Sequence, residues 1–157
     1  MCRSVVSCSR RIEYGRERVM KVNETRTRTG IIGVVDDDEF LREALGSVLK
    51  AAGLSARTFA SAEEFLACKD CNDTVCLVLD VRLPGMSGIE LQKHLRQSHS
   101  HLPIIFITGH GDASLGDSLM RAGASAFLSK PVRSDVLLRE IGRALSTRSE
   151  KNPDCTD

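Results

Sequence analysis

Five residues of this sequence combine acidic, hydroxyl and amine side chains, and each stands at the end of a short apolar run. They are Asp36, Asp37, Asp80, Thr108 and Lys130. Carboxylates that lie within a few ångströms of one another repel, which raises their affinity for protons or recruits a cation. A hard divalent ion that prefers oxygen ligands, such as Mg²⁺, relieves that repulsion. The set therefore predicts a cation site with a lysine and a hydroxyl beside it.

This combination of groups favours transfer of a phosphoryl group to a carboxylate, because positioning and charge neutralisation do most of the catalysis in that reaction. Asp80 is the best candidate for the nucleophile, since it stands alone at the end of a strongly apolar run. Lys130 would supply a positive charge opposite, and Thr108 a hydroxyl for the phosphoryl oxygens. Any one acidic residue could instead cap a loop or a helix, where Asp is common. Five such residues at successive strand ends favour a phosphoryl-transfer site over separate capping roles.

The elements that position these residues alternate along the chain. Short β-branched apolar runs predict strands, and apolar residues at helical spacing predict helices. Strands are expected at residues 31–35, 56–59, 75–79, 104–107 and 126–129. Helices are expected at 40–49, 61–66, 89–95, 112–122 and 134–145. This alternation predicts an α/β fold in which right-handed crossovers build a parallel sheet with helices on both faces. Ligands of such sheets bind beyond the carboxyl ends of the strands.

Local signals set the ends of several helices. Ser61, with Glu64 three residues later, predicts a capping box at the second helix, and Ser87 is the expected cap of the third. Gly116 lies inside the fourth helix, where glycine costs about 1 kcal/mol of helix propensity. We therefore expect that helix to be mobile or irregular.

The 157 residues, 41% hydrophobic and 27% charged, suit one globular domain that folds without disulfides or structural metals. No apolar run reaches the roughly 18 residues of a membrane span, and no secretory signal is recognisable, so a cytoplasmic location is expected. Residues 1–29 are expected to form a basic, disordered leader, in which Met20 is an alternative start. Residues 30–146 form the domain, and 147–157 a polar tail.

Cysteine spacing offers a second possible site. Cys68 and Cys71 form one CxxC motif, and Cys76 follows five residues later. A zinc site usually needs a second ligand pair, and none follows. The motif does not open a helix after a strand, as a thioredoxin-like site would. In a reducing cytoplasm these cysteines are expected to be free thiols.

Four stretches resemble the receiver domains of response regulators, in the CheY-like superfamily. They are VVDDDEFLREAL at 34–45, LVLDVRLPGMSGIEL at 77–91, IIFITGHGD at 104–112 and AFLSKP at 126–131. The sequences of these stretches are most similar to those of receivers of the FixJ/NarL type. The resemblance covers residues 30–146 and implies a flavodoxin-like (β/α)5 fold with strand order 2-1-3-4-5.

The resemblance also implies roles for the acidic residues. Asp80 resembles the phosphorylated aspartate of the family. Asp37 would be a direct ligand of Mg²⁺, and Asp36 would act mostly through water. The backbone carbonyl of Arg82 would complete the protein ligands of the ion.

Four further residues match the switch elements of the family. Thr108 resembles the hydroxyl that turns toward the phosphoryl group, and Lys130 the lysine that pairs with it. A cis peptide bond is implied before Pro131. Phe127 matches an aromatic residue that swings inward on activation.

The function implied is a phosphorelay switch. A sensor histidine kinase or a phosphotransfer protein would donate the phosphoryl group, and a protein effector would bind the face made by the fourth helix, fifth strand and fifth helix. The receiver would be a monomer or a phosphorylation-dependent dimer, without direct binding of DNA or membrane.

Other functions compete with this reading. The short tail after residue 146 favours a stand-alone receiver over a truncated FixJ/NarL-type regulator. A phosphorylation-independent interaction module is a further alternative. A phosphatase of the haloacid dehalogenase type would need an acid two residues after Asp80, where this sequence has Arg82, so no enzymatic turnover of external substrates is expected.

Overall fold

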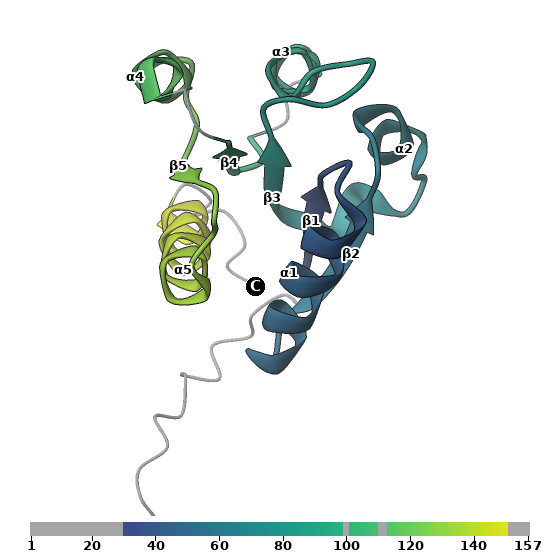
Figure 1. The fold of residues 1–157 in the computed structure, drawn as a ribbon, viewed down its shortest axis with the longest axis vertical. Helices are drawn as coiled ribbons and strands as arrows, with labels where there is room; N and C mark the ends of the chain where they lie inside the picture. The colour runs from purple at the N-terminus through teal and green to yellow at the C-terminus, as the bar shows by residue number, and fades with distance from the viewer. Residues whose placement is uncertain (1–29, 99–100, 110–112, 151–157) are drawn as a thin grey trace, which may run out of the picture.

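The computed structural model describes residues 30–98, 101–109 and 113–150 (Figure 1). The strands are β1 (Ile31–Val35), β2 (Ser55–Phe59), β3 (Thr74–Asp80), β4 (Ile104–Thr108) and β5 (Ala126–Ser129). The α-helices are α1 (Glu39–Ala51), α2 (Ala62–Ala67), α3 (Gly88–Gln97), α4 (Ala113–Arg121) and α5 (Ser134–Glu150). A 3₁₀ turn, η1 (Cys71–Asp73), precedes β3. The predicted leader lies outside these residues.

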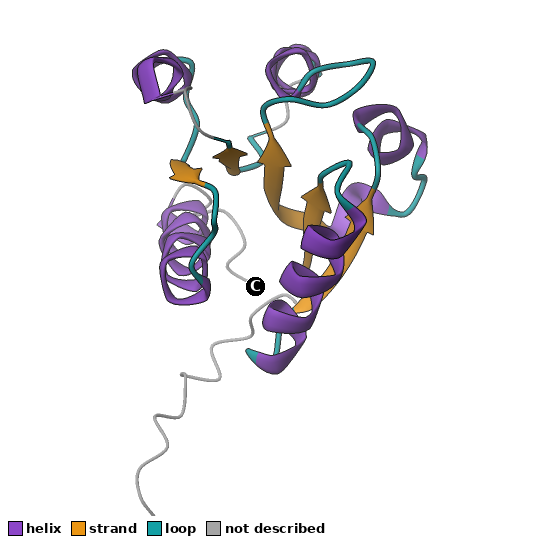
Figure 2. Ribbon diagram, viewed as in Figure 1, coloured by secondary structure: helices purple, strands orange, loops and turns teal. Residues whose placement is uncertain are grey.

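The strands form one parallel sheet in the order β2-β1-β3-β4-β5 (Figure 2). This order and the flanking helices confirm the predicted α/β, flavodoxin-like fold. None of the helices in the described residues has the length and apolar character that crossing a membrane requires.

Both faces of the sheet are buried because its strands are apolar at successive positions. In β3, Cys76 and Val78 pack with the helices α1 and α5, whereas Leu77 and Leu79 pack with α2, α3 and α4. Successive side chains of a strand point to opposite faces, so one apolar run serves two cores. The central strands are thereby held rigidly between two helical layers, and their carboxyl ends are fixed in space.

Helix caps agree in part with the predictions. Ser87 and Glu90 make the full reciprocal capping box of α3. At α2, the Ser61 hydroxyl accepts a hydrogen bond from the Glu64 N–H, but the Glu64 carboxylate accepts its bond from the N–H of Ala60. The predicted box at α2 is therefore only half formed, since the acidic side chain reaches one residue further back.

Two helices differ from expectation. The fifth runs to Glu150, beyond the predicted end near residue 145, because no proline or glycine interrupts the polar residues that follow. The fourth is a regular α-helix through Gly116, so the predicted irregularity is not found. A Cβ atom at Gly116 would lie 3.2 Å from Cδ1 of Phe127. The missing side chain at Gly116 thus leaves room for the Phe127 ring.

The prediction of free thiols is wrong for two of the cysteines. Cys68 and Cys71 form a disulfide, with their Cα atoms 5.6 Å apart. The α2 helix ends at Ala67 and η1 begins at Cys71, so the chain turns between them and brings the two side chains together. Cys76 is buried and free, as predicted.

Candidate functional site

The carboxyl edge of the sheet gathers the residues that end its strands. Asp36 follows β1, Asp80 and Thr108 are the last residues of β3 and β4, and Lys130 follows β5. Backbone hydrogen bonds continue the sheet into these positions: the Asp36 N–H donates to the Phe59 carbonyl, and the Lys130 N–H donates to the Thr108 carbonyl at 2.7 Å. Residues far apart in sequence are therefore held side by side.

Three carboxylates of this edge form a cluster. One ligand atom from each of Asp36, Asp37 and Asp80 lies within 4.8 Å of the other two. Asp36 is fully buried and Asp80 is 4% exposed, whereas Asp37 is exposed to solvent. Oxygen ligands at this spacing, with one open side, match the preference of Mg²⁺ for a few carboxylates and several waters. The residues present thus fit a divalent cation.

Lys130 is the counter-charge of the cluster. Its Nζ atom lies 2.7 Å from Oδ2 of Asp80 and 3.0 Å from Oδ2 of Asp36. Partial burial alone would lower the pKa of Lys130, but the hydrogen bonds and charges of the two carboxylates outweigh it and raise that pKa. The lysine is therefore a firmly held cation at neutral pH.

Asp36 retains unused capacity to bind a cation. Its Oδ1 accepts a hydrogen bond from the Asp38 N–H at 2.8 Å. Its Oδ2 accepts no well-aligned hydrogen bond from the described residues, although the Lys130 amine is close enough for an ion pair. Burial, aided by the charge of Asp80, raises the pKa of Asp36 against the opposing effects of the hydrogen bonds. A buried oxygen in this state is a suitable ligand for a metal ion or its water.

The loop after β3 fixes the orientation of Asp80. The N–H of Arg82 donates to Oδ1 of Asp80 at 2.9 Å, which leaves Oδ2 to Lys130. The chain then turns back, so that a Cβ atom on Gly88 would lie 2.2 Å from the Asp80 carbonyl oxygen. Only glycine fits this approach, and the carboxylate is pre-positioned before any ligand binds.

The predicted switch residues lie around the same edge. Thr108 is buried, and its hydroxyl donates to the carbonyl of Gly109 at 3.5 Å. Phe127 is half-buried, with its ring packed on Gly116 of α4. The peptide bond between Lys130 and Pro131 is cis. Of these, the contact between Phe127 and Gly116 links β5 to α4.

Two residues that support the site were not predicted from the sequence. The Arg42 guanidinium donates to the Asp36 carbonyl at 2.7 Å, and the Glu63 carboxylate accepts the Met86 N–H at 2.8 Å. That hydrogen bond lowers the pKa of Glu63. The position of Arg42, one helical turn after the Asp38 cap, could have indicated its role. The role of Glu63 could not be predicted in this way, because 23 positions of sequence, including all of β3, separate it from Met86.

The comparisons with known proteins agree with this geometry. The family model described as the response regulator receiver domain matches residues 32–142. The chain belongs to this family, and its strand order is the one that the family resemblance implied.

Individual relatives are transcriptional and response regulators. The response regulator protein TodT of Pseudomonas putida is 42% identical over 118 residues, which cover 75% of this chain and 52% of TodT. The transcriptional regulatory protein FixJ of Azorhizobium caulinodans is 38% identical over 120 residues, 76% of this chain and 57% of that protein. The chain spans about half the length of the curated relatives it matches.

Solved structures show the same fold. The response regulator StyR superposes with a TM-score of 0.72 at 43% identity, covering 78% of this chain and 62% of that one. The structure titled FixJ-N gives a TM-score of 0.68 at 38% identity, covering 74% of this chain and 94% of that one. The second match covers nearly a whole solved chain, so the described residues correspond to a complete receiver fold.

Proposed function

We propose that this receiver accepts a phosphoryl group on Asp80 from a sensor histidine kinase or a phosphotransfer protein, with Mg²⁺ as cofactor. The observation that carries the proposal is that the Asp80 carboxylate lies next to both Lys130 and the acidic pair Asp36 and Asp37. Its Oδ2 atom is near the cation, and the cluster provides the metal ligands. Asp36 has the same neighbours but is fully buried, whereas Asp80 is 4% exposed.

The acidic pair would hold Mg²⁺ together with Asp80 and the backbone carbonyl of Arg82. When bound, the ion offsets the negative charge that gathers as a phosphoryl group approaches a carboxylate. Lys130 supplies a second positive charge, 2.7 Å from Oδ2 of Asp80. The Arg82 N–H keeps the Asp80 side chain in one orientation, which reduces the entropy lost on reaching the reactive geometry.

Phosphorylation would change the partners of Lys130 and Thr108. A phosphorylated Asp80 carries more charge and more acceptor oxygens than a carboxylate. Lys130 would move from Asp36 toward these oxygens, and the Thr108 hydroxyl would turn to them. Because the backbones of these two residues are hydrogen-bonded, the movement would reach β5, Phe127 and the α4-β5-α5 face.

The output would then be a protein partner that binds this face, or a further domain attached to the receiver, since the curated relatives are about twice as long as the matched region. We place the protein in the cytoplasm, where its phosphoryl donors act. We further propose that it turns over no external substrate, since Arg82 occupies the position where a phosphatase of this geometry needs an acid.

Incubation with acetyl phosphate and Mg²⁺, or with beryllofluoride and Mg²⁺, tests the assignment. The expected result with acetyl phosphate is one phosphoryl adduct by intact-protein mass spectrometry in the natural chain and none in Asp80→Asn. Asp38→Asn is the matched control, because Asp38 is an exposed cap of α1 outside the carboxylate cluster, and asparagine caps helices as well as aspartate. An equal adduct in Asp80→Asn would overturn the proposal.

A further inference from the structure

We propose that the bond between Cys68 and Cys71 is a reversible redox site, opened by small thiols of the glutathione class and closed again by their disulfides. The site lies at the amino end of β3, the strand whose carboxyl end is Asp80. It shares no residue with the phosphoacceptor site, so the proposal stands apart from the proposed function.

The position of this bond suits exchange better than stabilisation. Its loop encloses only two residues, and the closure entropy that a disulfide removes from the unfolded chain is smallest for short loops. Both cysteines are partly exposed, and exposed disulfides are more readily reduced than buried ones. The bond therefore stabilises the fold less than a disulfide closing a longer loop would, while remaining open to attack.

A cation lies beside one of the two sulfur atoms. The Nη1 atom of Arg57, in β2, donates to Sγ of Cys68 at 3.2 Å. A neighbouring guanidinium stabilises a thiolate over a thiol, and a more stable thiolate leaves faster in exchange. This asymmetry assigns Cys68 as the leaving sulfur and Cys71 as the sulfur that is attacked.

The exchange proceeds in two balanced steps. The incoming thiolate forms a bond to Sγ of Cys71, the Cys68–Cys71 bond breaks, and its electron pair remains on Cys68 as a thiolate beside Arg57. A second small thiolate then attacks the small-molecule sulfur of the mixed disulfide and releases Cys71. In total, two small thiols are oxidised to one disulfide, and their two protons go to the cysteines.

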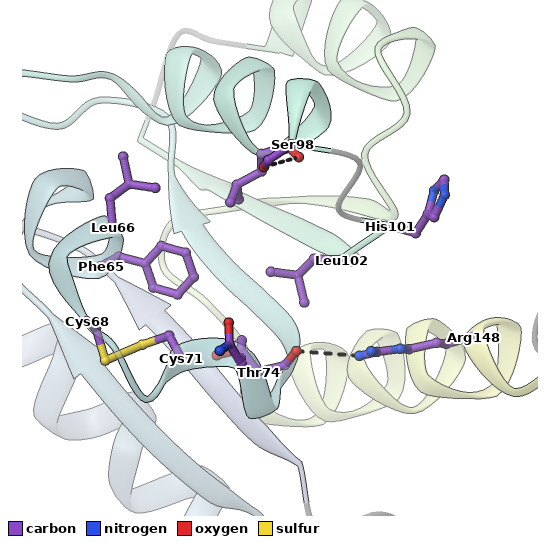
Figure 3. A pocket seen from close by; sticks show the side chains of 11 residues that line it. Phe65, Leu66, Cys68, Cys71, Thr74, Ser98, His101, Leu102 and Arg148 are labelled. Atoms are coloured by element: carbon purple, nitrogen blue, oxygen red, sulfur yellow. Dashed lines mark hydrogen bonds between the residues drawn. A yellow bond between two sulfur atoms is a disulfide. The ribbon is translucent and has the colours of Figure 1, made fainter.

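An open groove gives small thiols access to the bond. The groove has a volume of about 910 Å³, and Phe65, Leu66, Cys68, Cys71, Thr74 and Leu102 are among its lining residues (Figure 3). Figure 3 shows the bond beside the ring of Phe65, at one wall of the groove. Cys76 provides the contrast, since burial raises its pKa to about 12 and leaves it inert.

Incubation of the full chain with reduced and oxidised glutathione at graded ratios tests the site. Free thiols are blocked with one alkylating reagent, and newly reduced thiols are labelled with a second. Digestion after Lys69 yields two peptides that only this disulfide joins. The joined peptides should rise and fall with the glutathione ratio, while Cys76 remains a thiol. A bond that persists at every ratio, or that never forms, would overturn the proposal.

The role of Arg57 has its own test in the reduced chain. Native Cys68 should be alkylated at neutral pH roughly tenfold more slowly in Arg57→Gln, which corresponds to about one unit of thiol pKa. Lys50→Gln, an exposed position on α1, is the matched control and should leave that rate unchanged. Protection of Cys76 from alkylation reports that each variant is folded. Equal rates for Cys68 in Arg57→Gln and the natural chain would refute the assigned leaving sulfur.

Discussion

The groups at the two ends of β3 differ in their effect on the stability of the fold. At the carboxyl end, buried carboxylates lie next to one another, and one lysine offsets their charge. At the amino end, two cysteines form a neutral covalent bond at the surface. Buried charge costs stability unless it is paired, whereas a short disulfide loop adds a little. The groups at the carboxyl end are therefore kept at a cost in stability, whereas the bond at the amino end adds to stability.

The largest loss of stability is expected when a side chain is added in the loop that follows Asp80. Gly88→Ala places a Cβ atom against the Asp80 carbonyl, and a backbone neighbour cannot move away as a side chain could. We expect the free energy of unfolding, measured by urea denaturation, to fall by about 3 kcal/mol. Gly142→Ala is the control: its Cβ would meet nothing within 4 Å, so helix propensity should stabilise α5 by about 0.5–1 kcal/mol. Equal effects at both glycines would show that the loop is loosely packed.

At the amino end, loss of the disulfide should have a moderate effect. The double variant Cys68→Ser/Cys71→Ser should lower the free energy of unfolding by about 2 kcal/mol, the closure entropy of so short a loop. Its reaction with acetyl phosphate should remain unchanged, because the bond lies at the far end of β3. A large loss of phosphorylation in this variant would mean that the two ends are coupled.

Replacing Lys130 should leave the buried carboxylates without their counter-charge and so destabilise the fold. Lys130→Met should lower the free energy of unfolding at neutral pH by about 1–2 kcal/mol, a value reduced for the partial exposure of the lysine. The raised pKa of Lys130 means that its stabilising effect is complete below the ordinary value of 10.5 and is lost as the pH rises through the folded-state pKa. Urea denaturation at pH 7 and about pH 11 measures this, and the advantage of the natural chain over the variant should be smaller at the higher pH.

The smallest expected effect is an increase in stability when the charge of Asp36 is removed. Because burial raises the pKa of Asp36 above 3.8, the folded state binds the proton more tightly, and stability falls as the pH rises through that window. Asp36→Asn should therefore increase the free energy of unfolding by about 1 kcal/mol at pH 7 without Mg²⁺. The gain should shrink as the pH falls below 3.8, where the carboxyl becomes protonated in the folded and the unfolded chain alike. A loss of stability at pH 7 would show that the ion pair with Lys130 outweighs burial.

Much of the fold followed from local patterns in the sequence. The β-branched runs that end in Asp36, Asp80 and Thr108 are short and bounded, and a strand buried on both faces needs such runs. The helix ends do not follow from such patterns, because a polar stretch such as the one after residue 145 can continue a helix or leave it. The hydrogen bond from the Ala60 N–H to the Glu64 carboxylate likewise depends on the direction in which the chain enters α2.

Residue types and their order along the chain are properties of the sequence, and they determined the parallel sheet and the set of residues at its carboxyl edge. The tertiary structure alone decided how those residues meet. Lys130 reaches Asp80 across fifty positions of sequence, Phe127 packs on Gly116, and Cys68 bonds with Cys71 beside Arg57. Each of these contacts depends on how separate elements turn and pack. Sequence spacing limits which residues can meet, but only the packed crossovers set the distances between them.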